Sequence, residues 1–217
     1  MDDGTNQLEG LPKPGDTIAG KYLVQRVIGA GGMGAVVSAR HAQLGHQVAI
    51  KFLLTEFVCF PAAVARFLRE ARAAVAIHSE HIARVSDVGE LDTGAPYMIM
   101  EYLEGRDLEE VLEEQGPLPV LEAVDYVLQA CEALAEAHAN ALVHRDLKPA
   151  NLFLAQRPDG SPLIKVLDFG IAKALDEMRD VSKPSLTTTG SALGTPMYMS
   201  PEQVRGAKSV DPRTDIW

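Results

Sequence analysis

The chain has 217 residues, of which 47% are hydrophobic and 23% are charged. That composition is typical of a folded globular protein with room for one large domain or two small lobes. Its net charge of −10 argues against nucleic-acid binding, which needs a basic surface. The two cysteines, Cys59 and Cys131, are too few for a disulfide framework, and they lack zinc-ligand spacing, which indicates a reducing compartment.

The start of the chain and its hydrophobic pattern bear on localisation. Met1-Asp2-Asp3 lacks the basic and apolar regions of a signal peptide. No stretch of the sequence approaches the length that a membrane-spanning helix needs. We therefore expect a cytoplasmic protein, or the cytoplasmic part of a longer protein that is anchored in a membrane.

The first hundred residues predict a small antiparallel sheet that carries one helix. Residues 1–20 are expected to form a flexible leader, since they begin with a Gly-, Pro- and Asp-rich stretch. Strand-like apolar runs then follow one another at short separations, which favours antiparallel hairpins. These runs lie near residues 22–24, 35–37, 47–52, 83–88 and 97–101. Between them, Pro61 opens a helical stretch over residues 62–77.

The remaining residues predict a mainly helical region. Asp107 is placed to cap a short helix that ends at Gly116-Pro117. Residues 120–140 have the spacing of a long helix. Its expected apolar face comprises Val124, Val127, Leu128, Cys131, Leu134 and Ala135. Cys131 is accordingly expected in the core.

A hairpin and a polar segment complete the pattern. Residues 152–154 and 163–167 predict two strands around the turn Pro158-Asp159-Gly160. Residues 174–193 are rich in Ser, Thr, Lys and Asp and are expected to be mobile. The whole pattern predicts an α+β fold, with one lobe over residues 21–101 and a second over residues 102–217.

A glycine cluster, Ile28-Gly29-Ala30-Gly31-Gly32-Met33-Gly34-Ala35-Val36, has G-x-G-x-x-G-x-V spacing. Glycines at these positions would let the backbone approach phosphates closely. Taken alone, the cluster could equally be a tight hairpin or the dinucleotide-binding turn of an oxidoreductase. A dinucleotide-binding turn should open a helix, whereas a strand-like run follows here, so the oxidoreductase is disfavoured.

Lys51 ends the apolar run Val48-Ala49-Ile50. A lone lysine in this position more often extends its stem to the surface. Combined with the glycine cluster, it could instead contact the α- and β-phosphates of a nucleotide while a carboxylate holds it. Glu70, inside the predicted helix, suits that role better than Glu56, which precedes the helix.

The most specific chemical signal comes from two short runs. They are His144-Arg145-Asp146-Leu147-Lys148-Pro149-Ala150-Asn151 and, further along the chain, Asp168-Phe169-Gly170. Asp146 could orient an attacking hydroxyl, and Lys148 could offset the charge of a phosphate in transfer. Asn151 and Asp168 offer the oxygen ligands that Mg²⁺ prefers. The alternative is a turn whose Asp and Asn cap their own backbone. His144 is expected to pack, and we expect His78 and His81 to have loop or packing roles.

These motifs, in this order, resemble the eukaryotic-like (Hanks-type) protein kinases, and bacterial members most of all. Gly194 to Glu202 resembles their peptide-substrate loop, with Ser200-Pro201-Glu202 replacing the commoner Ala-Pro-Glu. Lys148 and Gly194-Thr195 resemble the serine/threonine branch. The resemblance implies a two-lobed fold with ATP in the cleft, Mg²⁺ (or Mn²⁺) as cofactor, and serine or threonine residues of proteins as substrates.

The resemblance also implies roles for single residues. Asp146, Lys148, Lys51 and Glu70 would be catalytic, and Asn151 and Asp168 would hold the metal. The expected nucleotide contacts are Ile28, Gly29, Gly31, Gly34, Val36, Ala49, Lys51, Met100, Glu101, Leu103 and Phe153. Among these, Met100 would be the gatekeeper, and Glu101 and Leu103 would offer backbone groups to adenine.

Regulation is expected through phosphorylation of the polar segment. A phosphate there could pair with Arg145 and order the segment. Thr187 and Thr189 best match the positions that bacterial relatives use, with Thr188 and Ser191 as nearby alternatives, and Thr195 is a further regulatory position. Autophosphorylation in trans would require a kinase–kinase dimer.

One departure from the family concerns the end of the sequence. In the family, Asp215 begins a buried helix that braces the catalytic loop, and more helices follow. Without them, apolar surface of the second lobe is expected to be exposed, and the 217-residue chain alone is expected to be unstable or poorly active. A non-catalytic fragment that binds a nucleotide or a partner is therefore the alternative to an active kinase.

Overall fold

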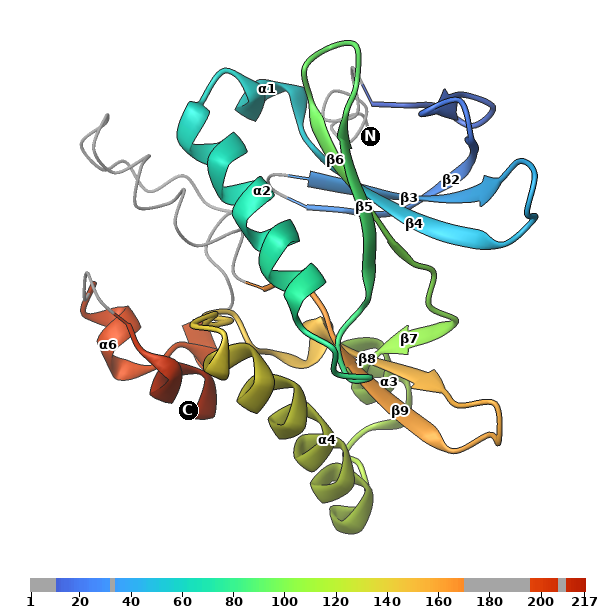
Figure 1. Cartoon of the computed structure of the whole chain (residues 1–217). Helices are drawn as coiled ribbons and strands as arrows, with labels where there is room; N and C mark the ends of the chain where they lie inside the picture. Colours follow the sequence, from blue (N-terminus) through green and yellow to red (C-terminus); the bar gives the residue numbers. More distant parts are fainter. Residues whose placement is uncertain (1–10, 32–33, 170–195, 207–209) are drawn as a thin grey trace, which may run out of the picture. The chain divides into compact units, whose positions relative to one another are not determined.

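The computed structural model describes residues 11–31, 34–169, 196–206 and 210–217, which fold into an α+β structure as the sequence predicts. The chain divides into two compact units. The first comprises Met1–Val75 with Arg84–Tyr102, and the second comprises Ala76–Ala83 with Leu103–Trp217. Figure 1 shows the elements of each unit. Of the helices that the structure describes, none combines the length and the apolar character needed to cross a bilayer.

The first unit is built on a six-stranded antiparallel sheet with strand order β1-β2-β3-β4-β6-β5 (Figure 1). Its strands are β1 (Thr17–Ile18), β2 (Tyr22–Ala30), β3 (Gly34–His41), β4 (Gln47–Leu53), β5 (Val85–Glu90) and β6 (Pro96–Glu101). Two helices, α1 (Thr55–Val58) and α2 (Pro61–Ala76), follow β4. The predicted hairpins and the predicted helix are confirmed.

Alternation of side chains explains why these segments form a sheet with a core. In β3, Ala35, Val37 and Ala39 have no exposed surface, because every second residue points to the same face of a strand. Ile50 and Phe52 of β4 are also fully buried. Burial of side chains of this size stabilises the fold by about 1.5–3 kcal/mol each.

The end of the expected leader differs from the prediction. Thr17 and Ile18 pair with Leu23 and Tyr22 of β2. Leu11 and Ile18 are buried, with exposed fractions of 7% and 4%. These apolar side chains therefore fix residues 11–20 against the first unit, so this part of the expected flexible leader is folded.

The second unit pairs a three-stranded sheet, in the order β7-β8-β9, with helices (Figure 1). Its elements are β7 (Gly105–Asp107), α3 (Leu108–Gln115), α4 (Val120–Ala139), η1 (Pro149–Asn151), β8 (Leu152–Gln156), β9 (Pro162–Val166), η2 (Pro196–Tyr198), α6 (Pro201–Val204) and η3 (Pro212–Ile216). The predicted β8–β9 hairpin is confirmed. Asp107 caps α3 as predicted, since its side chain accepts a hydrogen bond from the Glu110 N–H.

Residues 76–83 lie in the range expected for the first lobe but belong to the second unit. Ile77 and Ile82 are buried in the core of the second unit. The backbone of His81 accepts a hydrogen bond from the Val166 N–H at 2.8 Å, and its Nδ1 lies 2.9 Å from the carbonyl oxygen of Ile164. The segment is therefore held by β9, which the local sequence pattern did not predict.

The buried face of α4 differs in part from the predicted face. The residues that it buries are Tyr126, Ala130, Ala133, Leu134 and Ala137. The small alanines let the helix lie close to the sheet, and α4 contacts β9. Val124, Val127 and Leu128 are half or more exposed, and Cys131 is exposed rather than in the core. Apolar surface was expected to be exposed in this unit. The prediction that Cys131 lies in the core was wrong.

Candidate active site

Strand register in the first unit brings four of the predicted nucleotide-binding residues to one face of the sheet. Val36 of β3 lies opposite Lys51 of β4, and Ala49 lies opposite Met100 of β6. Residues directly opposite each other in neighbouring strands share a face, as do residues two apart in one strand. Lys51 therefore shares this face with Val36, Ala49 and Met100, while its neighbours Ile50 and Phe52 face the core.

The glycine cluster continues this face along β2 and β3. Gly29 lies opposite Val36, and the Gly31 N–H donates to the carbonyl oxygen of Gly34 at 2.9 Å. A Cβ atom on Gly34 would lie 2.8 Å from the carbonyl oxygen of Phe52, so a side chain at this position would displace the backbone. Ile28 is 39% exposed. The described residues of the cluster end β2 and begin β3, so a strand follows the cluster, as the sequence predicted.

Several predicted residues of this site cannot be placed in the same way. Glu70 lies in α2, but its side chain is outside the described part of the chain. Thr187, Thr189 and Thr195 also lie outside the described residues. Leu103 is half-buried at the start of the second unit's main segment.

Glu101 is held at the end of β6. Its backbone N–H donates to the carbonyl oxygen of Arg84 at 3.0 Å. Its carboxylate Oε1 accepts from the Arg84 N–H at 2.9 Å. This pair of contacts ties the end of β6 to the residue that precedes β5.

The predicted catalytic residues of the second unit lie together in one loop. Lys148 Nζ lies 3.2 Å from Asp146 Oδ2. The side-chain amide of Asn151 donates to the carbonyl oxygen of Asp146 at 2.7 Å and to its Oδ2 at 3.2 Å. Since Asn151 uses its nitrogen in this way, its Oδ1 is the atom that can serve a metal ion.

A buried carboxylate fixes the backbone of this loop. Asp215 Oδ2 accepts from the His144 N–H, and Oδ1 accepts from the Arg145 N–H, both at 2.7 Å. The same Oδ2 lies 2.7 Å from Nε2 of His138, and the Asp215 side chain has no exposed surface. Hydrogen bonds to a buried charge are stronger than those between neutral groups. Arg145, held in this way, adopts a left-handed φ of 67°.

His144 links the loop to the segment that contains Asp168. Its Nδ1 accepts from the Asp146 N–H at 3.2 Å, and its Nε2 lies 2.8 Å from the carbonyl oxygen of Leu167. These partners assign a neutral ring protonated on Nε2. Burial lowers the pKa of His144, against smaller opposing effects of its hydrogen bond to Leu167 and of nearby carboxylates. The expectation that His144 packs rather than reacts agrees with its complete burial.

Asp168 follows this linkage directly. The Leu167 N–H donates to the carbonyl oxygen of Asn151 at 2.9 Å, and the ring of Phe169 lies 5.0 Å from that of His144. Asp168 lies between these two anchored residues with a left-handed φ of 54°. A non-glycine residue holds such a conformation only where its surroundings enforce it, often at functional sites. The two predicted metal ligands, Asn151 and Asp168, thus belong to hydrogen-bonded neighbouring segments.

Phe153 lies in the middle strand of the small sheet, between Asp107 and Lys165 of the neighbouring strands. Leu152 and Leu154 on either side of it pack against the core of the second unit. Alternation along the strand therefore places Phe153 on the opposite face of the sheet.

Sequence reasoning missed two residues that support the loop. His138 contacts Asp215, as described above, and Gln203 donates from Nε2 to the carbonyl oxygen of Arg145 at 2.7 Å. Gln203 also completes a capping box with Ser200 at the start of α6. The Ser-Pro-Glu-Gln pattern could have signalled that box, but no local pattern signals the contact with Arg145.

Comparison with known proteins agrees with this arrangement. Residues 22–217 match the family described as "Protein kinase domain". The chain is 43% identical over 203 residues to the serine/threonine-protein kinase pkn3 of Myxococcus xanthus, covering 94% of this chain and 37% of the relative. It is 38% identical over 203 residues to the serine/threonine-protein kinase PknB of Mycobacterium leprae, covering 92% and 31%. The chain therefore spans about a third of the length of these curated relatives.

A crystal structure of the PknI kinase domain of Mycobacterium tuberculosis is similar in fold. The TM-score is 0.69 with 33% sequence identity, and the match covers 94% of this chain and 72% of that one. The motifs around Lys51, Asp146 and Asp168 all fall inside the matched residues.

Proposed function

Because the chain belongs to the protein kinase family, whose members use ATP and Mg²⁺, we propose that it transfers the γ-phosphoryl group of ATP to serine and threonine hydroxyls of proteins. The curated relatives that are 43% and 38% identical to this chain are named serine/threonine-protein kinases. The observation that carries the proposal is the loop in which Asn151 and Lys148 both contact Asp146. Such a set orients a hydroxyl beside a positive charge, which is what phosphoryl transfer requires.

In the proposed reaction, Asp146 accepts the hydrogen bond of the attacking hydroxyl and takes its proton. Lys148 offsets the negative charge of the phosphoryl group in transit. Asn151 Oδ1 and the Asp168 carboxylate hold Mg²⁺, with Mn²⁺ as an alternative, since both ligands are hard oxygen donors. The metal ion supplies charge neutralisation to the phosphates when bound.

We propose the nucleotide contacts that the resemblance to protein kinases implies. Lys51, with Glu70 as its proposed partner, would contact the α- and β-phosphates, and Gly29, Gly31 and Gly34 would lie along them. The remaining proposed contacts with adenine and ribose are Ile28, Val36, Ala49, Met100, Glu101, Leu103 and Phe153. Because the Glu101 N–H is bonded to Arg84, we assign the adenine contact of that residue to its carbonyl oxygen.

The test is phosphate transfer from radiolabelled ATP to a generic protein acceptor in the presence of Mg²⁺, with nucleotide binding measured in parallel. We expect transfer by the wild type and its loss in Asp146→Asn, which keeps the shape of the side chain but removes its negative charge. The matched control, Asp92→Asn, makes the same change in the exposed β5–β6 turn and should leave transfer intact. Nucleotide binding without transfer by a folded wild type would contradict the proposal and favour a non-catalytic binding protein.

We further propose regulation by autophosphorylation. Phosphate on Thr187 or Thr189, with Thr195 as a further position, would pair with the Arg145 guanidinium, and a transient kinase–kinase dimer would allow transfer in trans. An equal rate of transfer by wild type and by the Thr187→Ala, Thr189→Ala double variant would contradict this.

We place the reaction in the cytoplasm, where ATP is available and the unpaired cysteines Cys59 and Cys131 stay reduced.

A further inference from the structure

The peptide group that joins Arg145 to Asp146 is held from two sides. Its carbonyl oxygen accepts a hydrogen bond from Gln203 Nε2 at 2.7 Å, and its N–H donates to His144 Nδ1 at 3.2 Å. Because a peptide group is planar and includes the Cα atom of the following residue, these two contacts set the orientation of the whole group. The direction in which the Asp146 side chain leaves the backbone is set with it.

Arg145 itself adopts a conformation that needs support. Its φ of 67° lies in the left-handed region, which a residue other than glycine keeps only where its surroundings enforce it. Asp215 Oδ1 accepts from the Arg145 N–H at 2.7 Å, which fixes the peptide group before Arg145. The Gln203 contact fixes the one after it. Loss of the Gln203 contact would therefore let the Arg145–Asp146 peptide group rotate.

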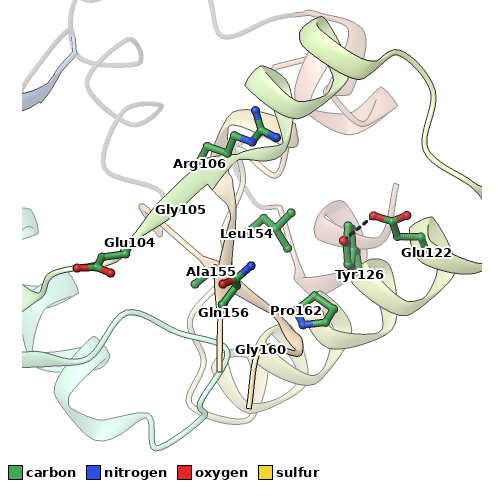
Figure 2. Close-up of a pocket in the computed structure, with 10 residues that line it drawn as sticks. All are labelled: Glu104, Gly105, Arg106, Glu122, Tyr126, Leu154, Ala155, Gln156, Gly160 and Pro162. Atoms are coloured by element: carbon green, nitrogen blue, oxygen red, sulfur yellow. Dashed lines mark hydrogen bonds between the residues drawn. The ribbon is translucent and has the colours of Figure 1, made fainter. Parts of the chain in front are cut away.

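The space beside this peptide group leaves room for such a rotation. A hollow of about 100 Å³ is lined by Gln203 and by Arg145 and Leu147, the two residues that flank Asp146. Another hollow of the same unit, about 630 Å³ in volume, lies along β7 and β8 (Figure 2) and includes none of the residues assigned above to phosphoryl transfer. Of these two hollows, the smaller is the one that bears on the loop, since packing alone does not hold the backbone beside it.

The Gln203 amide is fixed at both of its ends. Its Oε1 accepts from the Ser200 N–H at 3.0 Å, so its Nε2 is the atom that faces the carbonyl oxygen of Arg145. Ser200 is only 1% exposed, and its Oγ lies 3.2 Å from Thr214 Oγ1. Thr214 directly precedes Asp215. The two side chains that hold the backbone of Arg145, one from α6 and one from η3, are therefore linked to each other.

We propose that Gln203 is a positioning residue for phosphoryl transfer, which acts through the Arg145–Asp146 peptide group to set the direction of the Asp146 carboxylate. Lys148 and Asn151 contact Asp146 from within the loop, whereas Gln203 ties the loop to α6. This role rests on the proposed kinase function for the reaction that it serves. The tie itself requires no phosphoryl transfer.

The variant that tests this role is Gln203→Glu. It removes the donor to the Arg145 carbonyl oxygen but keeps an oxygen for the Ser200 N–H, and glutamate also completes a capping box. We expect kcat for phosphate transfer, per folded molecule, to fall about 10–100-fold, since a small misplacement of a reacting group costs that much. KM for ATP should stay unchanged, because the contact bears on the reacting hydroxyl and not on nucleotide binding.

The matched control is Gln129→Glu, which makes the same change at a site of the same kind. Gln129 Oε1 accepts from the Ile164 N–H at 2.9 Å, and its Nε2 donates to Asp125 Oδ2 at 2.8 Å. Neither partner belongs to the loop, so kcat should equal that of the wild type. The urea midpoint of both variants shows how much of each is folded. A comparable fall in kcat in both variants would overturn the proposal.

The pH dependence of Gln203→Glu gives a readout that a merely structural role would not move. A protonated glutamate carries an O–H donor, which restores the contact with the Arg145 carbonyl oxygen. The ratio of variant to wild-type kcat should therefore rise as the pH falls from about 8 to about 5.5, where the carboxyl group begins to bind its proton. The carboxylates of Glu202, Asp146 and Asp215 are common to both proteins, so the ratio removes their titration. A constant ratio would contradict the proposal.

Hydrogen exchange of the Asp146 N–H, measured by NMR, separates this proposal from the kinase function. Gln203→Glu should speed the exchange about 3–10-fold, the effect of losing one hydrogen bond, and Gln129→Glu should not. An unchanged exchange rate, or an unchanged kcat, in Gln203→Glu would contradict the positioning role alone. Faster exchange in Gln203→Glu, with no transfer by the folded wild type, would contradict the kinase function alone.

Discussion

The two units hold the side chains that we propose for phosphoryl transfer in different ways. In the first, Lys51 is positioned by strand register, since its place opposite Val36 and Met98 sets the face on which it lies. In the second, Asp146 lies in a loop whose neighbouring backbone N–H groups are bound by Asp215, 71 residues after His144. The sheet positions its lysine through regular backbone pairing, whereas the loop depends on one distant carboxylate. The two regions should therefore respond differently to substitution.

The sharpest test of this difference is Asp215→Asn. The substitution replaces one carboxylate oxygen by an NH₂ group, which cannot accept a hydrogen bond from the donors around it. It also removes a buried negative charge that three groups contact: the His138 ring and the N–H groups of His144 and Arg145. Breaking such an arrangement costs about 3–5 kcal/mol in the free energy of unfolding. We expect a large fall in the midpoint of urea unfolding together with loss of phosphate transfer. An unchanged midpoint would mean that the loop does not depend on Asp215.

The counterpart in the first unit is Lys51→Met. The strand pairing that positions residue 51 involves its backbone, so replacing the side chain by an apolar one of similar length should leave the unfolding midpoint nearly unchanged. Transfer should fall about 10²–10³-fold, the usual cost of removing one group that stabilises developing charge. The measurement is the rate of transfer beside the urea midpoint. A large loss of stability would show that Lys51 is structural and would weaken the contrast between the units.

The same contrast explains which parts of the fold and of the candidate site the sequence predicted. The strands of the first unit and the α3 cap were predicted because their signals are local: the apolar run at residues 35–37 and the Asp107 cap need no distant partner. Motif order and the resemblance to protein kinases predict roles for Asp146, Lys148 and Asn151, and the kinase fold predicted from the same motifs is confirmed.

What the sequence did not predict depends on contacts between distant residues. Residues 76–83 belong to the second unit because His81 contacts β9. Cys131 is exposed because β9 packs on the alanine-rich side of α4, and the helical pattern alone could not choose between two apolar sides. The contacts of His138 with Asp215 and of Gln203 with Arg145 are likewise set by tertiary packing, which leaves no periodic signal.

A change of pH should affect the second unit in particular, because His144 belongs to the hydrogen bonds that hold its loop. Its folded-state pKa is lowered, mainly by burial, while the unfolded chain binds the proton near pH 6.5. Below that pH the unfolded state holds more protons, so stability present above pH 6.5 is lost as the pH falls, by at most about 1.4 kcal/mol per pH unit. The measurement is the urea midpoint from pH 8 down to about pH 5. His144→Gln, which cannot titrate, should show a shallower decline, and equal declines would exclude His144 as the cause.

The smallest expected effect tests whether distance along the chain, rather than membership of the second unit, makes a contact critical. Asp107 accepts its capping hydrogen bond from the Glu110 N–H, three residues away, at 2.9 Å. Asp107→Ala should cost about 1 kcal/mol of unfolding free energy, the usual loss for a helix cap. Transfer per folded molecule should stay the same, because α3 carries none of the residues assigned to the reaction. If Asp107→Ala lowered transfer as much as Asp215→Asn, local and distant contacts would support the loop alike, and the contrast between register and long-range bracing would not hold.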